Sequence, residues 1–231
     1  MNRYDRQISL PEIGAAGQAR LGKAKVLIVG VGGLGSPIAL YLAGAGVGTL
    51  AMIDDDRVGL TNLQRQILYT ETDIGQNKAL CAARRVRELN GDIQAEAYPC
   101  RLDKSNACEL ISQYDIVVDG CDNLATRYLI SDTCHALGKP YVYGAIRGFE
   151  GQVSVFCHGQ GAKTYRDLYP DEDGALGMTP QDNAVMGVTP AIVGIVEANE
   201  VLKLIAGYGE PLAGKLWTID LRTMMSNMLA L

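Results

Sequence analysis

Residues 25–40 read KVLIVGVGGLGSPIAL, and this stretch decides the fold class. Its first part, KVLIVG, is short and continuously apolar, which is typical of a parallel strand buried on both faces. A glycine-rich turn follows, and Ser36 with Pro37 predicts the start of a helix, because serine caps helices and proline is favoured in their first turn. Residues 49–53, TLAMI, read as a second strand, so the segment is predicted to form a right-handed βαβ unit.

The alternation of strand and helix continues along the chain. It predicts helices over 76–89, 105–112, 124–137 and 191–206, and strands over 93–98, 116–119, 152–156, 215–219 and 224–229. The segment 158–189 is polar and rich in glycine and proline, so we expect a long loop there. Together these patterns predict one domain over residues 1–231, of the α/β class, with a Rossmann-like, doubly wound, mostly parallel sheet and additional C-terminal strands.

Charge and hydropathy exclude several classes of partner. The 231 residues contain 21 Lys and Arg against 26 Asp and Glu, a formal net charge of -5, so a broad nucleic-acid-binding face is not expected. No window approaches the ~20 uninterrupted apolar residues of a membrane span. The first residues, MNRYDRQISLPEIG, show no charged leader before an apolar run. We therefore expect a cytoplasmic protein without a membrane partner.

The turn GVGGLG lies between a strong strand and a helix, which is the context of a nucleotide-binding loop. Gly30, Gly32 and Gly33 allow a phosphate to approach backbone N–H groups at the positive end of the helix. Asp54 ends the second strand roughly 20 residues later, where a carboxylate accepts hydrogen bonds from a ribose. We interpret Asp55 as a solvated loop carboxylate. A nicotinamide dehydrogenase fits these features as well as an ATP-binding enzyme does.

Polar residues after the second strand favour a triphosphate over a dinucleotide. Arg65 lies in the segment TNLQRQ, and Lys78 follows in GQNK at the start of a predicted helix. Two cations beside a nucleotide suit a triphosphate, although either side chain could instead be a solvated surface charge. Asp122 follows the strand at 116–119 and is the candidate ligand for Mg²⁺. The alternative is that Asp122 or Asn123 only caps the next helix.

These motifs, in this order and spacing, resemble the ThiF/MoeB/HesA family. The resemblance rests on GVGGLGS, on Asp54-x-Asp56-x-Val58 leading into TNLQRQ, on GQNK and on the CDN triplet. It extends from the YDRQ opening to GVTP at 187–190 and the helix after it, and so covers nearly the whole chain. Members are bacterial relatives of ubiquitin-activating enzymes, and they adenylate the C-terminal Gly-Gly of small ubiquitin-fold sulfur carriers.

The resemblance implies a site for ATP and Mg²⁺ that a homodimer completes. It implies catalytic roles for Arg65, Lys78 and Asp122, with Asp122 holding Mg²⁺, and for Arg6, which reaches the ATP of the partner subunit. The implied nucleotide-binding residues are Gly30, Gly32, Gly33, Asp54, Asp56, Asn62, Arg65, Gln66, Lys78, Asp122 and Asn123.

The cysteines depart from the family pattern. Many relatives hold a structural zinc with two CxxC pairs, but none of the six cysteines here forms such a pair. Thr164-Tyr165-Arg166-Asp167 stands where a CYRC-like segment is expected, so we predict that the chain binds no zinc. The loop cysteine of some relatives would fall near Asn183, and no cysteine lies after Cys157. Covalent handling of the carrier at that position is therefore not expected.

The predicted reaction needs positioning and charge rather than a general base. A peptide C-terminal carboxylate has a pKa of ~3.5 and is already ionised at neutral pH. We interpret His135 and His158 as structural or surface residues. The predicted function is ATP- and Mg²⁺-dependent adenylation of a sulfur carrier, in thiamine (thiazole) synthesis first and molybdopterin synthesis second. The alternative is a regulatory protein that binds nucleotide without adenylating anything, and tight NADH binding is not expected.

Overall fold

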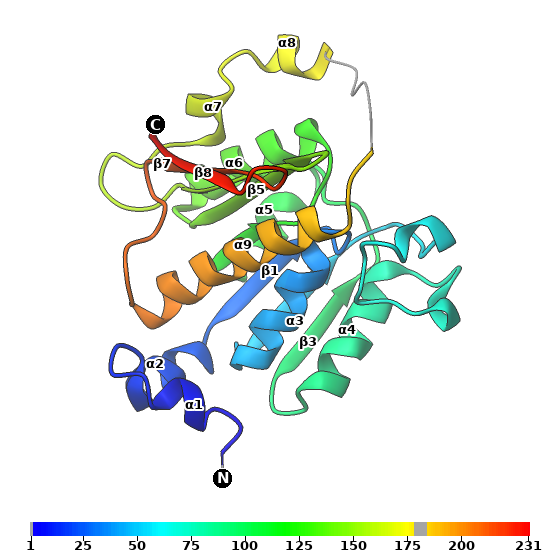
Figure 1. Cartoon of the computed structure of the whole chain (residues 1–231), viewed down its shortest axis with the longest axis vertical. Coiled ribbons are helices and arrows are strands. Elements are labelled where there is room, and N and C mark those ends of the chain that lie inside the picture. Colours follow the sequence, from blue (N-terminus) through cyan, green and yellow to red (C-terminus); the bar gives the residue numbers. More distant parts are fainter. Residues whose placement is uncertain (1, 178–183) are drawn as a thin grey trace.

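The computed structural model describes residues 2–177 and 184–231, and their strands form a single sheet (Figure 1). The strand order within this part of the chain is β3-β2-β1-β4-β5-β6-β7-β8. Neighbours from β3 to β5 pair in parallel, whereas β5 to β8 form antiparallel pairs. The predicted fold class, a mostly parallel doubly wound sheet with additional C-terminal strands, is confirmed.

Helices flank the sheet on both faces. The strands are β1 Lys25–Val29, β2 Thr49–Ile53, β3 Gln94–Tyr98, β4 Ile116–Asp119, β5 Tyr141–Arg147, β6 Glu150–Phe156, β7 Lys215–Asp220 and β8 Met225–Ala230. The α-helices are α1 Asp5–Ile8, α2 Gly14–Leu21, α3 Gly35–Ala45, α4 Lys78–Leu89, α5 Ala107–Ser112, α6 Leu124–Leu137, α7 Tyr165–Leu168, α8 Glu172–Gly177 and α9 Val188–Ala206. Two short 3-10 helices, η1 Leu60–Asn62 and η2 Glu71–Asp73, lie between β2 and α4.

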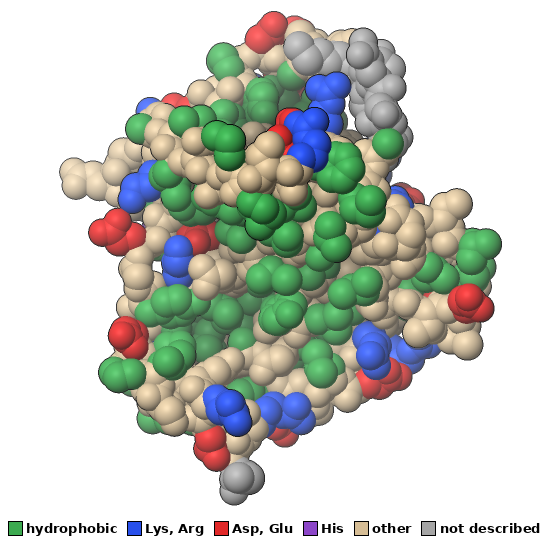
Figure 2. All heavy atoms as spheres, viewed as in Figure 1, with side chains coloured by type: hydrophobic (Ala, Val, Ile, Leu, Met, Phe, Trp, Pro, Cys, Tyr) green, Lys and Arg blue, Asp and Glu red, His purple; other side chains and the backbone are tan. Residues whose placement is uncertain are grey.

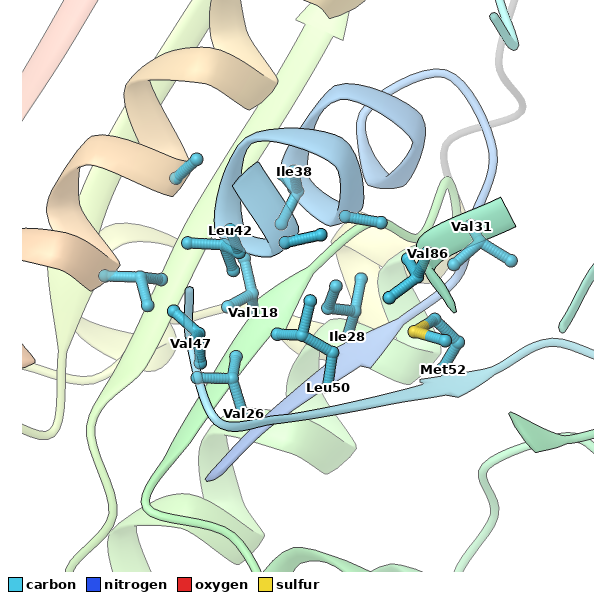
Figure 3. Packing of buried hydrophobic residues seen from close by; sticks show 14 of the residues in the cluster. Val26, Ile28, Val31, Ile38, Leu42, Val47, Leu50, Met52, Val86 and Val118 are labelled. Atoms are coloured by element: carbon cyan, nitrogen blue, oxygen red, sulfur yellow. The ribbon is translucent and has the colours of Figure 1, made fainter. Parts of the chain in front are cut away.

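Alternate residues of β1 belong to two different hydrophobic cores. Val26 and Ile28 pack with residues of α3, α4 and α9 (Figure 3), whereas Leu27 and Val29 pack with residues of α5 and α6. Each buried aliphatic side chain of this kind stabilises the fold by about 1.5–3 kcal/mol. Packing on both faces explains why the strand sequence is continuously apolar, and it fixes the position of the turn that follows β1.

The carboxyl ends of β1, β2 and β4 meet at one edge of the sheet. Val29 is in register with Ile53 on β2 and with Asp119 on β4. Gly30 follows with a φ of 85°, and a Cβ built on it would lie 2.7 Å from the carbonyl oxygen of Gly120. Only glycine suits this backbone and this contact. The turns that follow β1 and β4 therefore touch directly.

Helix starts differ from the predicted ones by a few residues. Helix α3 begins at Gly35 without a side-chain cap, and the Ser36 hydroxyl is buried with no hydrogen-bond partner among the described residues. Helix α4 begins at Lys78 rather than at 76, because Asn77 is its cap and accepts a hydrogen bond from the Leu80 N–H at 3.1 Å. Helix α9 begins at Val188 rather than at 191.

The prediction of a loop over 158–189 was wrong in part, because α7 and α8 lie within it. Both helices are too short to show a helical period in the sequence. Asp167 stabilises the start of α7, since its Oδ2 accepts hydrogen bonds from the N–H and the hydroxyl of Thr164, both at 2.8 Å. Residues 178–183 of the predicted loop, Asn183 included, lie outside the described residues. Strand β5 and helices α1 and α2 were not predicted.

Among residues 2–177 and 184–231, none of the helices combines the length and the apolar character needed to cross a membrane.

Candidate functional site

A pocket of about 1890 Å³ opens at the carboxyl edge of β1, β2 and β4. Typical small-molecule sites occupy about 300–1000 Å³, so this space can hold a nucleotide together with part of a second substrate. Its lining includes most of the residues predicted from the sequence. They are Gly30, Gly32, Gly33, Asp54, Asp56, Arg65, Gln66, Lys78, Asp122 and Asn123.

Asp54 at the end of β2 holds the glycine turn in place. Its Oδ2 accepts a hydrogen bond from the Val31 N–H and its Oδ1 accepts one from the Asp56 N–H, both at 2.9 Å. Burial raises the pKa of Asp54, although these two backbone hydrogen bonds and Lys78 act in the opposite direction. Oxygens that already accept one hydrogen bond can still accept a second one from a ribose hydroxyl.

Lys78 brings a nearly buried positive charge to the pocket. The residue is only 6 % exposed, and its Nζ donates to the Asp56 carboxylate at 2.8 Å. Asp56 is itself exposed, so water competes for its side of this ion pair. The ammonium group can therefore move from Asp56 to a phosphate oxygen without leaving another buried charge unpaired.

Two further polar side chains come from the segment between β2 and α4. The Arg65 guanidinium is half-buried in the pocket wall and donates to the Thr61 carbonyl at 3.1 Å. Gln66 is buried, and its Oε1 has no hydrogen-bond partner among the described residues. A buried amide oxygen without a partner costs free energy, so a hydrogen-bond donor of a ligand in the pocket suits this position.

Asn62 does not belong to the pocket lining. Its Oδ1 accepts a hydrogen bond from the Gly59 N–H at 3.0 Å, and this bond closes the turn around η1. The side chain supports the loop that precedes Arg65. Its predicted contact with the nucleotide stays a prediction.

Asp122 and Asn123 lie in the turn between β4 and α6. Asn123 caps α6, because its Oδ1 accepts a hydrogen bond from the Thr126 N–H at 2.9 Å. Capping is the alternative considered for this pair of residues, and it applies to Asn123. Asp122 is exposed on the pocket wall, where its carboxylate is available to a cation.

One group of three carboxylates within the described ranges could hold a metal ion, and it consists of Asp54, Asp55 and Asp56. Their oxygens lie within 4.8 Å of one another. The predicted metal ligand, Asp122, is not a member of this group, although it lines the same pocket.

Arg6 lies far from the pocket of its own chain. It belongs to α1, which packs near the C-terminal ends of α3 and α4, away from the pocket (Figure 1). There Gln7 donates to the Ala45 carbonyl at 3.0 Å, and Asn90 donates to the Tyr4 hydroxyl at 2.8 Å. A contact between Arg6 and phosphates therefore requires a second chain, as the resemblance implies.

The far wall of the pocket comes from the antiparallel strands and from the segment after α7. Gln152, Thr218 and Asn227 are in register across β6, β7 and β8, and all three line the pocket. Gln152 donates to the hydroxyls of Tyr143 and Tyr169 at 2.6 Å and 3.0 Å. This far wall is polar and aromatic. The opposite wall, the near wall, consists of the glycine turn and the charged side chains described above.

The sequence interpretation missed a buried ionic centre beneath Asp122. Arg127 on α6 lines the pocket, and its Nε donates to the Asp119 carboxylate at 3.0 Å. Arg127 is 8 % exposed and Asp119 is completely buried. The signal was present, because Arg127 shares its helix face with the buried Ile130 and Cys134, at i+3 and i+7.

All six cysteines are free thiols, of which Cys100 and Cys108 are exposed. In the segment that replaces a CYRC-like sequence, Arg166 pairs with Asp132 on α6 at 2.7 Å and with Glu172 on α8 at 2.8 Å. These ion pairs connect α6, α7 and α8. The absence of bound zinc stays a prediction.

Comparisons with known proteins show the family of the chain and the likeness of its fold to solved structures. Residues 4–231 match the ThiF family. The chain is 47% identical over 226 residues to a sulfur carrier protein adenylyltransferase of Thermus thermophilus, covering 95% of this chain and 83% of that protein. It is 44% identical to a probable molybdopterin-synthase adenylyltransferase of Porphyra purpurea, covering 92% of this chain but only 56% of that protein. The crystal structure of E. coli MccB with ATP superposes with a TM-score of 0.87 at 25% identity, covering 100% of this chain and 71% of MccB.

Proposed function

Because the chain belongs to the ThiF family, whose relatives described above are named adenylyltransferases, we propose that it transfers the adenylyl group of ATP to the C-terminal carboxylate of a small sulfur-carrier protein. The family and the enzyme class are those predicted from the sequence, and both are confirmed. One observation supports ATP as a substrate most directly. The glycine turn, Lys78, Arg65 and Asp122 all line one large pocket.

The residues of the near wall fit ATP. The turn containing Gly32 and Gly33 leads into α3, whose first N–H groups suit a phosphate. Asp54 lies where it can accept hydrogen bonds from a ribose, and Gln66, whose Oε1 has no partner among the described residues, lines the same pocket. MccB, which has the same fold, was crystallised with ATP. Asp122 would hold Mg²⁺, which would supply positive charge to the phosphate oxygens.

The proposed chemistry is attack of the carrier carboxylate on the α-phosphorus of ATP, which releases pyrophosphate. The attacking carboxylate is ionised at neutral pH, so the protein supplies no general base. Lys78 and Arg65 stabilise the negative charge that grows on the phosphate oxygens as the bond breaks. The pocket aligns the two substrates, which accounts for a large part of the rate enhancement in reactions of this kind.

ATP–pyrophosphate exchange tests this proposal. With Mg²⁺ and a carrier ending in Gly-Gly, the protein should exchange label between pyrophosphate and ATP. Removing one charged contact to the reacting phosphates costs about 100- to 1000-fold, so Lys78→Ala and Asp122→Ala should nearly abolish exchange. Arg85→Ala is the matched control, because Arg85 is an exposed cation of the same helix, α4, outside the pocket. Exchange that survives both pocket substitutions would contradict the assigned site.

The thiamine and molybdopterin carriers are to be compared side by side in this assay. The sequence places thiamine synthesis first, whereas the Porphyra purpurea relative, a probable molybdopterin-synthase adenylyltransferase, supports molybdopterin synthesis. The carrier that gives the larger kcat/KM for exchange identifies the pathway. Exchange with neither carrier would refute sulfur-carrier adenylation and leave the regulatory alternative.

We also propose that the active form is a homodimer. Exposed apolar side chains gather over α3 and α9 on one face of the molecule (Figure 2). Tyr41 on α3 is 56% exposed, and Val188 and Ile195 on α9 are 57% and 37% exposed. A continuous apolar face of this kind is typical of an interface. Sedimentation equilibrium should give twice the monomer mass, and Arg6→Ala should lower exchange without changing that mass.

A further inference from the structure

We propose that Arg127 is a positioning residue for adenylation: it fixes the turn that contains Asp122 and so determines where this carboxylate meets the substrate. The role of Asp122 in this inference rests on the proposed function. The fixing of the turn rests on the geometry of the described residues alone.

Arg127 connects three parts of the chain through one planar guanidinium group. Its Nε donates to the Asp119 carboxylate at 3.0 Å, and its Nη2 donates to the carbonyls of Cys121 and Gly144 at 3.0 Å and 3.1 Å. These acceptors belong to the end of β4, to the following turn and to β5. The guanidinium carbon also lies 5.4 Å from the centre of the Tyr143 ring. The fork of donors thus ties the turn to both neighbouring strands.

Asp119 holds the same turn from the other side. Its Oδ1 accepts from the Cys121 N–H at 2.9 Å, and its Oδ2 accepts from the Tyr141 hydroxyl at 2.8 Å. The N–H of Cys121 is therefore held by Asp119 and its carbonyl by Arg127. Both peptide groups of the residue before Asp122 are fixed by one buried ion pair.

The residue after Asp122 is fixed as well, because Asn123 caps α6. Asp122 is thus an exposed side chain on a backbone held at both ends. Supporting contacts of this kind commonly orient carboxylates that bind metal ions, and losing one typically costs about 10- to 100-fold in affinity or activity. Buried charges are costly to maintain, which makes a purely stabilising role a weak explanation for this pair.

Arg127→Lys is the decisive substitution. Lysine keeps the positive charge opposite Asp119 but lacks the planar fork that reaches the carbonyls of Cys121 and Gly144. We expect the rate of ATP–pyrophosphate exchange to fall by about 10- to 100-fold. The larger part of this loss should be in kcat rather than in the KM for ATP. The matched control is Arg84→Lys, because Arg84 pairs with a buried aspartate, Asp73, outside the pocket. This control should leave exchange unchanged.

A double substitution separates positioning from general support of the fold. In an Asp122→Asn background, Arg127→Lys should cause little further loss, because the carboxylate that it positions is already absent. If Arg127 only supported the fold, Arg127→Lys would lower ATP–pyrophosphate exchange by the same factor in the wild type and in Asp122→Asn. That outcome would overturn the inference.

Two measurements need no turnover and therefore test the inference even where the proposed function fails. Amide hydrogen exchange over residues 120–123 should be faster in Arg127→Lys than in the wild type. Calorimetric titration with a non-hydrolysable Mg·ATP analogue should show binding that is weakened by a smaller factor than kcat. If Arg127→Lys does not fold, the nearly isosteric Asp119→Asn replaces it, with the same expectations. A folded variant with unchanged amide exchange at 120–123 would refute the inference, whereas wild-type protein without pyrophosphate exchange would refute only the proposed function.

Discussion

Glu197 on α9 makes the stability of this protein depend on pH, and the burial of its carboxyl group fixes the sign of the dependence. The residue is completely buried, and neither carboxyl oxygen has a hydrogen-bond partner among the described residues. It lies against β5, where a Cβ built on Gly144 would be 2.3 Å from the Glu197 carboxyl carbon. Burial raises the pKa of Glu197 well above its ordinary value, Asp119 raises it further, and Arg127 partly opposes both effects.

The sign of the effect follows from proton uptake. The unfolded chain has an ordinary glutamate, ionised above pH ~4.3, whereas the folded chain keeps Glu197 protonated to a higher pH. Folding therefore binds a proton between these two pKa values. The free energy of unfolding loses about 1.4 kcal/mol for each pH unit in that window, and the stabilisation is fully present only below the unfolded pKa.

Glu197→Gln removes this dependence, because glutamine keeps the shape of the side chain but cannot ionise. The stability of the variant relative to wild type should rise with pH above ~4.3, by about 1.4 kcal/mol for each pH unit, until the pH passes the raised pKa of the folded protein. The pH-independent part of the difference in stability between variant and wild type reflects the contacts of the buried amide with its neighbours. The pH-dependent part does not contain that contribution.

Urea unfolding at a series of pH values measures this difference, with the single tryptophan, Trp217 on β7, as the fluorescent probe. Glu12→Gln makes the same chemical change on an exposed side chain and should give a curve parallel to wild type. If the Glu197→Gln curve is also parallel to wild type, Glu197 is ionised in the folded protein and the reasoning fails.

Three further substitutions test other parts of the structure. Gly144→Ala should destabilise the protein by about 1–3 kcal/mol in urea unfolding, because the added methyl group overlaps Glu197; combining it with Glu197→Ala should recover much of the loss. Asn123→Ala should lower the free energy of unfolding by about 1 kcal/mol through loss of the α6 cap, and an unchanged Tm would contradict the assigned cap. Arg166→Ala should change the free energy of unfolding by less than about 1 kcal/mol, because the ion pair of Arg166 with Asp132 is exposed. Limited proteolysis over 164–177 should become faster in this variant. A large drop in Tm would show that the pair contributes more than an ordinary surface ion pair.

Local sequence signals were sufficient to predict which residues form the near wall of the pocket. Asp54 directly follows β2, and Gly33 and Asp122 lie in the turns that follow β1 and β4. The carboxyl ends of these neighbouring parallel strands meet at one edge of the sheet. Their proximity could be predicted from the order of strands and helices alone. Lys78 was predicted correctly at the start of a helix, although the helix begins two residues later than expected.

Features that depend on distant contacts could not be predicted. Gly144 interrupts the apolar pattern of β5, and glycine is unfavourable in strands. The structure provides the reason for it, since Glu197 from a distant helix occupies the space that a side chain would need. Helices α7 and α8 have 4 and 6 residues and are held by ion pairs such as Arg166 with Asp132, which leave no periodic pattern in the sequence.

The two walls of the pocket differ in how freely they can be redesigned. The near wall includes the glycine turn after β1, where a substitution at Gly30 collides with Gly120 and disturbs the turn itself. On the far wall, Gln152, Thr218 and Asn227 form one row of side chains on three antiparallel strands. Each of these can be exchanged singly while the strand ladder stays intact. A library randomised at these three positions would vary the far wall of the pocket while the glycine turn of the near wall stays unchanged.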